Sequence, residues 1–187
     1  MKNIFLTIVF IILMQEFGYI QTTDSCFAGV YLDLTDFIQN KVTNKINVNK
    51  KGNDIKIKMT NIVKIITSDK VIKYKVGSIY GYYLCGNKYR YSSKSEIKAP
   101  EDFYKVEEIK GLIIYTSVFW GGAEYFYSLN ISSPIHRLNM NNLQKDFSEN
   151  SEFISEIKKA KLFDGLSTKN DKSEFVINLI YDKILKK

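Results

Sequence analysis

Two stretches of alternating side chains, each interrupted by glycine, constrain the fold of this chain more than any other feature. The first is YGYYLCGNKYRYS (residues 80–92), and the second is LIIYTSVFWGGAEYFYSLN (residues 112–130). Alternation with a period of two is typical of a strand with one buried face, and a glycine between two such runs indicates a tight turn. The sequence therefore predicts two aromatic β-hairpins, with turns at Gly86-Asn87 and Gly121-Gly122.

The predicted turn at Gly86-Asn87 sets the register of the first hairpin, pairing Tyr83 with Arg90. One face then carries Tyr80, Tyr82, Leu84, Tyr89 and Tyr91, and the other carries Tyr83, Cys85, Lys88 and Arg90. This separation favours the register, because slipping a strand by one residue moves its side chains to the opposite face. We expect the tyrosine face to belong to the core and Tyr83 to form a cation–π pair with Arg90 on the outer face.

The rest of the chain predicts an α+β fold. Between residues 54 and 130 the chain is a succession of short β-rich runs, among them DIKIKM, NIVKII and VIKYKV. Between residues 139 and 185 the apolar period becomes helical, with one stripe at Phe153, Ile157 and Ala160 and a second at Val176, Leu179, Ile180 and Ile184. A capping box from Asp171 to Glu174 is expected to open the last helix, and Thr35 to cap a short turn. We expect one antiparallel sheet of six to eight strands followed by C-terminal helices.

The N-terminus predicts export. Lys2 precedes the uninterrupted apolar run IFLTIVFIILM, whose eleven residues suit the core of a signal peptide. A span across a bilayer needs about 20 residues, so the mature chain is expected to contain no transmembrane segment. We assign residues 1–22 to the signal peptide, with cleavage between 22 and 25, and residues 23–187 to a single domain. An uncleaved anchor and lipidation of Cys26 are the alternatives, although TTDS before Cys26 lacks the apolar residue of a lipobox.

The chain contains two cysteines, Cys26 and Cys85, and an even number permits one disulfide in an exported protein. They are the candidate disulfide. No CxxC motif and no Cys/His zinc cluster is present in the sequence.

A lysine excess is the main electrostatic feature. The net charge is +7, yet Arg90 and Arg137 are the only arginines among 27 basic residues. Specific nucleic-acid recognition relies on arginine, so we expect none here. Lys56, Lys58, Lys73 and Lys75, together with Tyr83, Lys88 and Arg90, form a candidate cationic and aromatic surface. Its ligand would be an anionic polysaccharide, lipid headgroup or nucleic acid. The alternative is that outward lysines keep the sheet soluble and protect its edges.

Catalytic motifs are missing from the sequence. No G-x-S-x-G elbow, H-E-x-x-H, P-loop or dinucleotide fingerprint occurs, and the only histidine, His136, is interpreted as a loop residue rather than a general base. Glu101, Asp102 and Glu124 are the carboxylates that a hydrolase would use. We expect no catalytic residues, no metal site and no cofactor, and hence a protein that is not an enzyme.

Three segments carry a resemblance to known proteins: GVYLDLTDF after the apolar run, the hairpin with KYRY, and LQKDFSENSEFISEIKK leading to LIYDKILK. Over residues 29–185 the chain resembles small exported proteins of unknown function from Bacteroidetes-type bacteria. The resemblance implies an envelope or extracellular location without a known activity, and the Cys26/Cys85 pair departs from its pattern.

The sequence therefore favours an exported, non-enzymatic binding or interaction protein of the cell envelope. Its expected partner is an anionic envelope glycan or another envelope protein. An envelope-acting hydrolase using carboxylates and a structural protein anchored by an uncleaved N-terminus are the alternatives.

Overall fold

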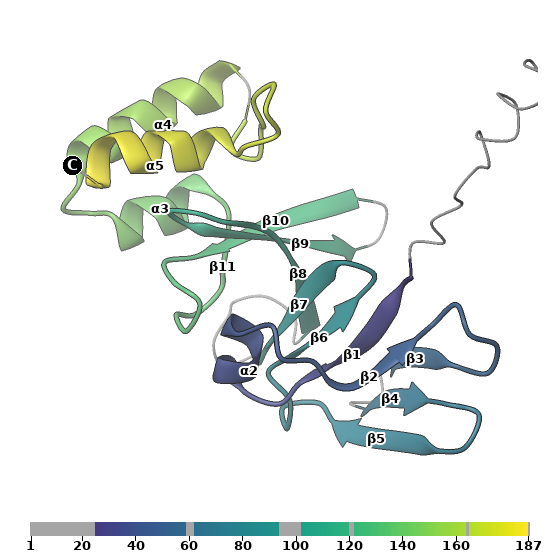
Figure 1. The fold of residues 1–187 in the computed structure, drawn as a ribbon. Helices are drawn as coiled ribbons and strands as arrows, with labels where there is room; N and C mark the ends of the chain where they lie inside the picture. The colour runs from purple at the N-terminus through teal and green to yellow at the C-terminus, as the bar shows by residue number, and fades with distance from the viewer. Residues whose placement is uncertain (1–24, 59–61, 94–101, 120–121, 164, 187) are drawn as a thin grey trace, which may run out of the picture.

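The computed structural model describes residues 25–58, 62–93, 102–119, 122–163 and 165–186 and has an α+β fold. An eight-stranded antiparallel sheet has the order β11-β10-β9-β8-β7-β6-β1-β2, and a separate three-stranded sheet has the order β3-β4-β5 (Figure 1). The strands of the two sheets are β1 (Phe27–Tyr31), β2 (Thr43–Asn47), β3 (Asp54–Lys58), β4 (Ile62–Ile66), β5 (Val71–Lys75), β6 (Gly81–Leu84), β7 (Asn87–Ser92), β8 (Asp102–Ile109), β9 (Ile113–Phe119), β10 (Gly122–Ser128) and β11 (His136–Arg137). Its helices are α2 (Leu34–Ile38), α3 (Met140–Asp146), α4 (Ser151–Phe163) and α5 (Val176–Leu185).

The predicted fold class is confirmed, with strands first and helices at the C-terminal end. The β-rich region is wider than residues 54–130, because β1 and β2 precede it and β11 follows it. The alternating strands 54–75 form a sheet of their own rather than part of one large sheet. The predicted signal peptide, residues 1–22, lies outside the described residues.

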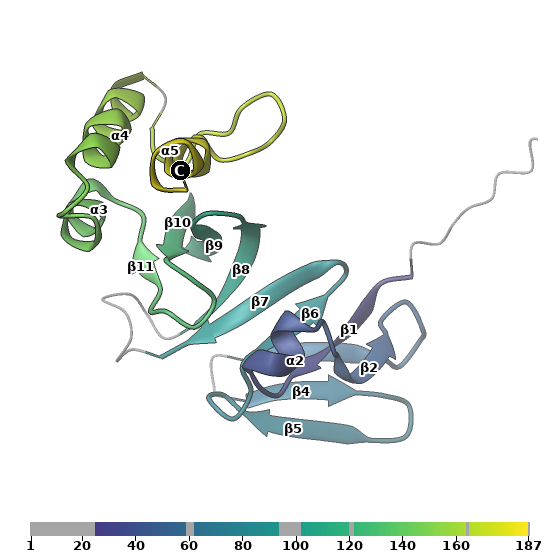
Figure 2. The same cartoon turned by 60° about the vertical axis from the view of Figure 1, so that its left-hand side comes forward.

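One face of the large sheet is covered at both of its ends. The register aligns Tyr89, Lys105 and Thr116 across β7, β8 and β9. The side chains of these residues, and of every second residue along each strand from them, therefore share one face. Near β1, β6 and β7 the three-stranded sheet covers it, with Val63 and Ile65 of β4 fully buried. Near β9 and β10 the helices α3, α4 and α5 cover it (Figure 2), and the core there is formed by Leu112, Ile114, Tyr127, Leu143, Phe147, Phe153, Ile157, Phe175 and Ile177.

The opposite face of the large sheet carries a third core. Its buried members are Tyr104, Ile113, Tyr115, Phe126 and Ile135. Ile135 belongs to the segment between β10 and β11, so this connection packs onto the sheet. Toward β1 the short helix α2 lies on the same side, where the Phe37 ring contacts the rings of Tyr31 and Tyr80 edge to face at 5.0 and 5.2 Å. Both faces of the sheet therefore carry buried side chains.

The first predicted hairpin exists, but its predicted register is wrong by two residues. Tyr83 pairs with Lys88, and Tyr82 pairs with Tyr89. The turn is formed by Cys85 and Gly86, whose φ angles of 46° and 85° are the pair of positive values that a type I′ turn requires. Because an offset of two preserves the side-chain faces, the aromatic face still enters the core, and the rings of Tyr82 and Tyr89 stack at 4.2 Å.

Tyr80 is the exception to the predicted aromatic face. It precedes β6, and its hydroxyl donates to the carbonyl of Ile131 on the α2 side of the sheet. The second hairpin repeats the offset of two residues, since Phe119 pairs with Gly122. Its connection is therefore residues 120–121, which lie outside the described residues, and not the predicted Gly121-Gly122.

Two helix-start predictions are wrong. Asp33, not Thr35, caps α2, and its side chain accepts from the backbone N–H of Asp36 at 2.8 Å. No capping box opens α5, which follows Phe175 directly. The predicted stripe of α5 is right in part: Ile180 and Ile184 pack against the core, but Leu179 is 41% exposed, and Ile177 and Asn178 are buried instead.

Candidate anion-binding sites

The outer face of the three-stranded sheet presents a row of lysines. Lys56 of β3 pairs with Lys64 of β4, and Lys64 pairs with Lys73 of β5. Residues paired in this way project to the same face, whereas their sequence neighbours Ile55, Ile65 and Ile72 belong to the core beneath. We call Lys56, Lys64, Lys73 and Lys75 the lysine face. Lys58 has the same parity in β3, but its side chain lies outside the described residues.

The lysine face contains little charge compensation. Like charges on directly opposed strand positions destabilise a sheet. Among the described residues, only Lys56 of this face forms an ion pair, at 3.5 Å from Asp54, and both partners are about half exposed. Such a pair contributes little. Edge protection explains lysines on β3 and β5 but not Lys64, because β4 is the central strand.

The sequence grouped Lys88 and Tyr83 with these lysines in one candidate surface, and this grouping is wrong. The two residues pair with each other on the large sheet, on the side where α2 lies. The Lys88 Nζ donates to the Phe37 carbonyl at 3.0 Å and lies over the rings of Tyr31 and Phe37. Burial lowers the pKa of the Lys88 ammonium. This lysine therefore holds the C-terminal end of α2 against the sheet.

Arg90 was predicted on an outer face with Tyr83, and this prediction is wrong. Its side chain is only 3% exposed, because α2 and the segment before β11 cover that face of the sheet. One η nitrogen donates to the Tyr115 hydroxyl at 3.0 Å and the other to the Ser133 carbonyl at 2.8 Å. Its cation–π partners are Tyr80 and Tyr115, at 5.5 and 5.9 Å from the ring centroids.

Arg90 also lines a pocket of about 540 Å³. The other lining residues come from the approach to α2, the β5–β6 connection, the end of β7 and the β10–β11 connection: Leu32, Asp33, Leu34, Gly77, Ser78, Ile79, Tyr80, Tyr91, Ser93 and Ser132. The pocket thus combines a buried cation with hydroxyl, aromatic and aliphatic side chains and with the carboxylate of Asp33, which caps α2. Alternation in the sequence assigned Arg90 to one face of the sheet, but it did not show that α2 and the segment before β11 would cover that face and enclose this pocket.

His136 forms a structural triad rather than a catalytic one. Its Nδ1 lies 2.5 Å from Asp146, and the same carboxylate oxygen accepts from the Tyr127 hydroxyl at 2.6 Å. Burial, followed by the hydrogen bond and charge of Asp146, raises the pKa of Tyr127. The contacts connect β10 and β11 to α3. The sequence placed His136 in a loop, whereas it pairs with Tyr127 as the first residue of β11.

The carboxylates considered for hydrolysis are dispersed or engaged. Glu101 lies outside the described residues, and Glu124 accepts from Arg137 at 2.9 Å. Burial raises the pKa of Asp102, although bonds from the Phe103 N–H and Ser117 oppose that shift. Within the described ranges, no group of three or more His, Cys, Asp or Glu side chains is placed to hold a metal ion.

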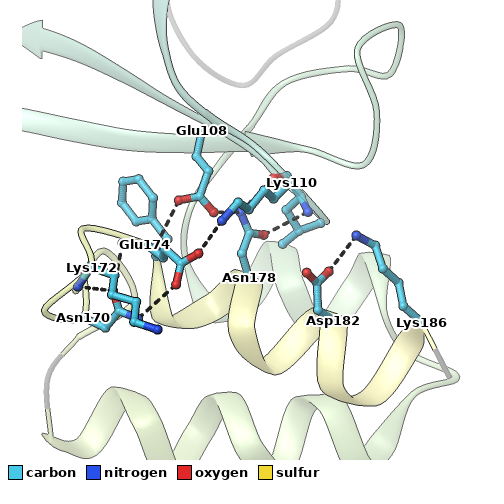
Figure 3. A network of polar contacts seen from close by, with 10 residues as sticks. Glu108, Lys110, Asn170, Lys172, Glu174, Asn178, Asp182 and Lys186 are labelled. Carbon is cyan, nitrogen blue, oxygen red and sulfur yellow. Dashed lines mark hydrogen bonds and ion pairs between the residues drawn. The ribbon is translucent and has the colours of Figure 1, made fainter.

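Glu108 joins β8 to the C-terminal helix. Its oxygens accept from the Phe175 N–H at 3.1 Å and the Asn178 amide at 2.7 Å (Figure 3). Lys110 and Glu174 form an ion pair beside it, and Asp182 pairs with Lys186 at 2.8 Å. The contacts of Glu108 and Lys110 anchor α5 to the end of the sheet, whereas the Asp182–Lys186 pair lies within the last turn of α5. They make a structural network that the sequence did not reveal.

The predicted disulfide is confirmed: Cys26 and Cys85 are bonded, with their Cα atoms 4.4 Å apart. It joins the residue before β1 to the turn between β6 and β7. No helix in the described part of the chain has the length and apolarity to cross a membrane.

Comparison with known proteins assigns no relative. No protein-family model matches the chain, and neither a curated protein nor a solved structure matches it.

Proposed function

We propose that this chain is an exported, non-enzymatic protein of the cell envelope that binds an anionic glycan through the lysine face. The observation that carries the proposal is the row formed by Lys56, Lys64 and Lys73 on three neighbouring strands. Their mutual repulsion weakens the free protein, and a bound polyanion relieves it.

The geometry of the row suits a linear polymer. Neighbouring strands lie roughly 4.8 Å apart, so the three backbone positions form a line across the sheet. Lys75 adds a fourth cation two residues after Lys73 on β5. Lysine is a flexible point charge with no fixed fork geometry. It therefore suits a repeating carboxylate polymer better than it suits the specific reading of bases.

Two features support export. The apolar run at residues 4–14 follows a lysine, as in a signal peptide. The Cys26–Cys85 disulfide is the second, because disulfides persist mainly in oxidising compartments. The resemblance to small exported proteins agrees with both.

Binding is tested with polygalacturonate, a linear polyuronate, on the protein with its disulfide formed. The triple variant K56E/K64E/K73E is expected to lose at least about tenfold in affinity, and wild-type binding is expected to weaken as salt rises. The matched control is K145E/K158E/K172E, which makes the same change in net charge on exposed lysines. Lys145 belongs to α3, Lys158 to α4 and Lys172 to the α4–α5 connection. Figure 1 shows these helices at the end of the molecule away from the three-stranded sheet.

An equal loss in both triple variants would mean that net charge alone attracts the polymer, which would overturn a dedicated face. Stronger binding to DNA or to phosphatidylglycerol vesicles than to polygalacturonate would replace the glycan with another polyanion. Neutral dextran gives the background.

Export is tested separately by the intact mass of the protein from envelope and medium fractions, with and without reductant and alkylation. We expect a mass lacking the first 22 to 25 residues and no free thiol before reduction. A full-length mass would instead support a protein anchored by its N-terminus.

A further inference from the structure

We propose that the pocket beside Arg90 binds a small hydroxylated monocarboxylate, of the chemical class of sugar acids. This site is separate from the lysine face and does not depend on it. Its volume of about 540 Å³ lies within the range of roughly 300–1,000 Å³ that small-molecule sites occupy. The space is sufficient for one monosaccharide-sized ligand.

The charge of Arg90 is the first argument. Arg90 is 3% exposed, and among the described residues its η nitrogens are bonded to a hydroxyl and a backbone carbonyl rather than to a carboxylate. Its Nε is buried and donates to no acceptor in the part of the chain that the structure describes. Burying a cation without a counter-charge is unfavourable. A carboxylate in the adjoining pocket supplies the missing charge.

The fixed orientation of the guanidinium is the second argument. Ser128 donates to the Asn130 carbonyl at 2.7 Å, so the Tyr115 hydroxyl donates to Ser128 and accepts from Arg90. With the second η nitrogen held by the Ser133 carbonyl, the fork is oriented before any ligand arrives. Two of the five N–H donors of a guanidinium are used by these contacts. A preoriented arginine with donors remaining is suited to a planar carboxylate.

The remaining walls define the rest of the ligand. Ser78 and Ser132 place hydroxyl groups at the exposed edge, and Ile79 and Tyr91 supply apolar surface. Hydroxyls beside apolar surface match the alternating polar and apolar faces of a sugar ring. Asp33 also lines the pocket, and its negative charge disfavours ligands that carry several anionic groups. The pocket therefore selects a monoanion over a polyphosphate.

Calorimetry with sodium D-glucuronate and with glucose tests the proposal on the disulfide-bonded protein. The two sugars share a ring and differ in the carboxylate. Glucuronate is expected to bind at least about tenfold more tightly than glucose, the ratio that one charge-assisted contact produces. Equal affinity for the two sugars, or binding of neither, would overturn the assignment.

Variants at Ser132 locate the binding without disturbing the core. Ser132→Glu brings a competing carboxylate to the pocket and is expected to abolish glucuronate binding, whereas Ser132→Gln loses the same hydroxyl and should retain it. Unchanged binding in Ser132→Glu would place the ligand elsewhere. Arg90→Gln should also abolish binding, with near-ultraviolet circular dichroism reporting its fold. K56E/K64E/K73E should bind glucuronate normally, so that failure of this site and failure of the lysine face are distinguishable.

Discussion

Asn178 of α5 binds both backbone polar groups of Leu112. Its Oδ1 accepts from the Leu112 N–H at 2.9 Å, and its Nδ2 donates to the Leu112 carbonyl at 2.9 Å (Figure 3). Both residues are buried, so the side chain provides the bonds that water cannot. This amide fixes α5 to the turn between β8 and β9.

Replacing Asn178 with leucine, which has a similar volume, should lower the free energy of unfolding by about 2–6 kcal/mol. The reason is that two buried backbone groups lose their partners, at roughly 1–3 kcal/mol each. Urea unfolding measures the change. Leu179→Ala, at the neighbouring exposed position, is the control and should change stability by less than about 1 kcal/mol. A small effect of Asn178→Leu would mean that water reaches this turn.

Gly111 allows the same turn to approach α5. Its φ is +27°, and a Cβ at this position would lie 2.7 Å from Cδ1 of Tyr181. Gly111→Ala should therefore cost about 1–3 kcal/mol in the free energy of unfolding, through overpacking and backbone strain. Gly122→Ala is the matched control, because nothing lies within 4 Å of its Cβ position. If both variants unfold at the same urea concentration, α5 does not pack closely on this turn.

The Cys26–Cys85 disulfide closes a loop with a sequence separation of 59 residues. Replacing both cysteines with serine should lower the free energy of unfolding by about 2–4 kcal/mol, chiefly because the unfolded chain becomes freer. Urea unfolding with and without reductant measures the effect. Reductant should destabilise the wild type and leave the double variant unchanged. Equal responses of the two proteins to reductant would contradict the disulfide's contribution.

Apart from Tyr80, alternation predicted the faces of the first hairpin, but it predicted the register of neither hairpin. Within paired strands, a shift of two residues leaves each side chain on its original face, so the hydrophobic pattern cannot distinguish the predicted and observed pairings. The turn sequence should decide, but Cys85 is an unusual residue for the left-handed conformation that it adopts. A tertiary contact helps to fix this turn: the Cys85 N–H donates to the Phe27 carbonyl of β1 at 2.8 Å.

The lysine face was partly predictable, because alternation along a strand shows which side chains point away from the core. Lys56 and Lys73 face outward, as their strand patterns indicate, and Lys64 follows the same pattern although it was not included. Arg90 was misplaced because alternation identifies a face without identifying what covers it. The segment before β11, distant in sequence, supplies Ser133 and encloses the arginine.

Asp102 should make stability depend on pH, because burial raises its pKa above the ordinary value of 3.8. A folded-state pKa above the unfolded value means that stability falls as pH rises from 3.8 through the folded pKa, and stays lower above it. Asp102→Asn removes this loss and keeps the acceptor for the Phe103 N–H. The variant should thus be more stable than wild type at pH 7 and equal to it below pH 3.8. Urea unfolding across this pH range measures the difference, with the exposed Asp171→Asn as control. A gain that persists unchanged in acid would show that charge burial is not its cause.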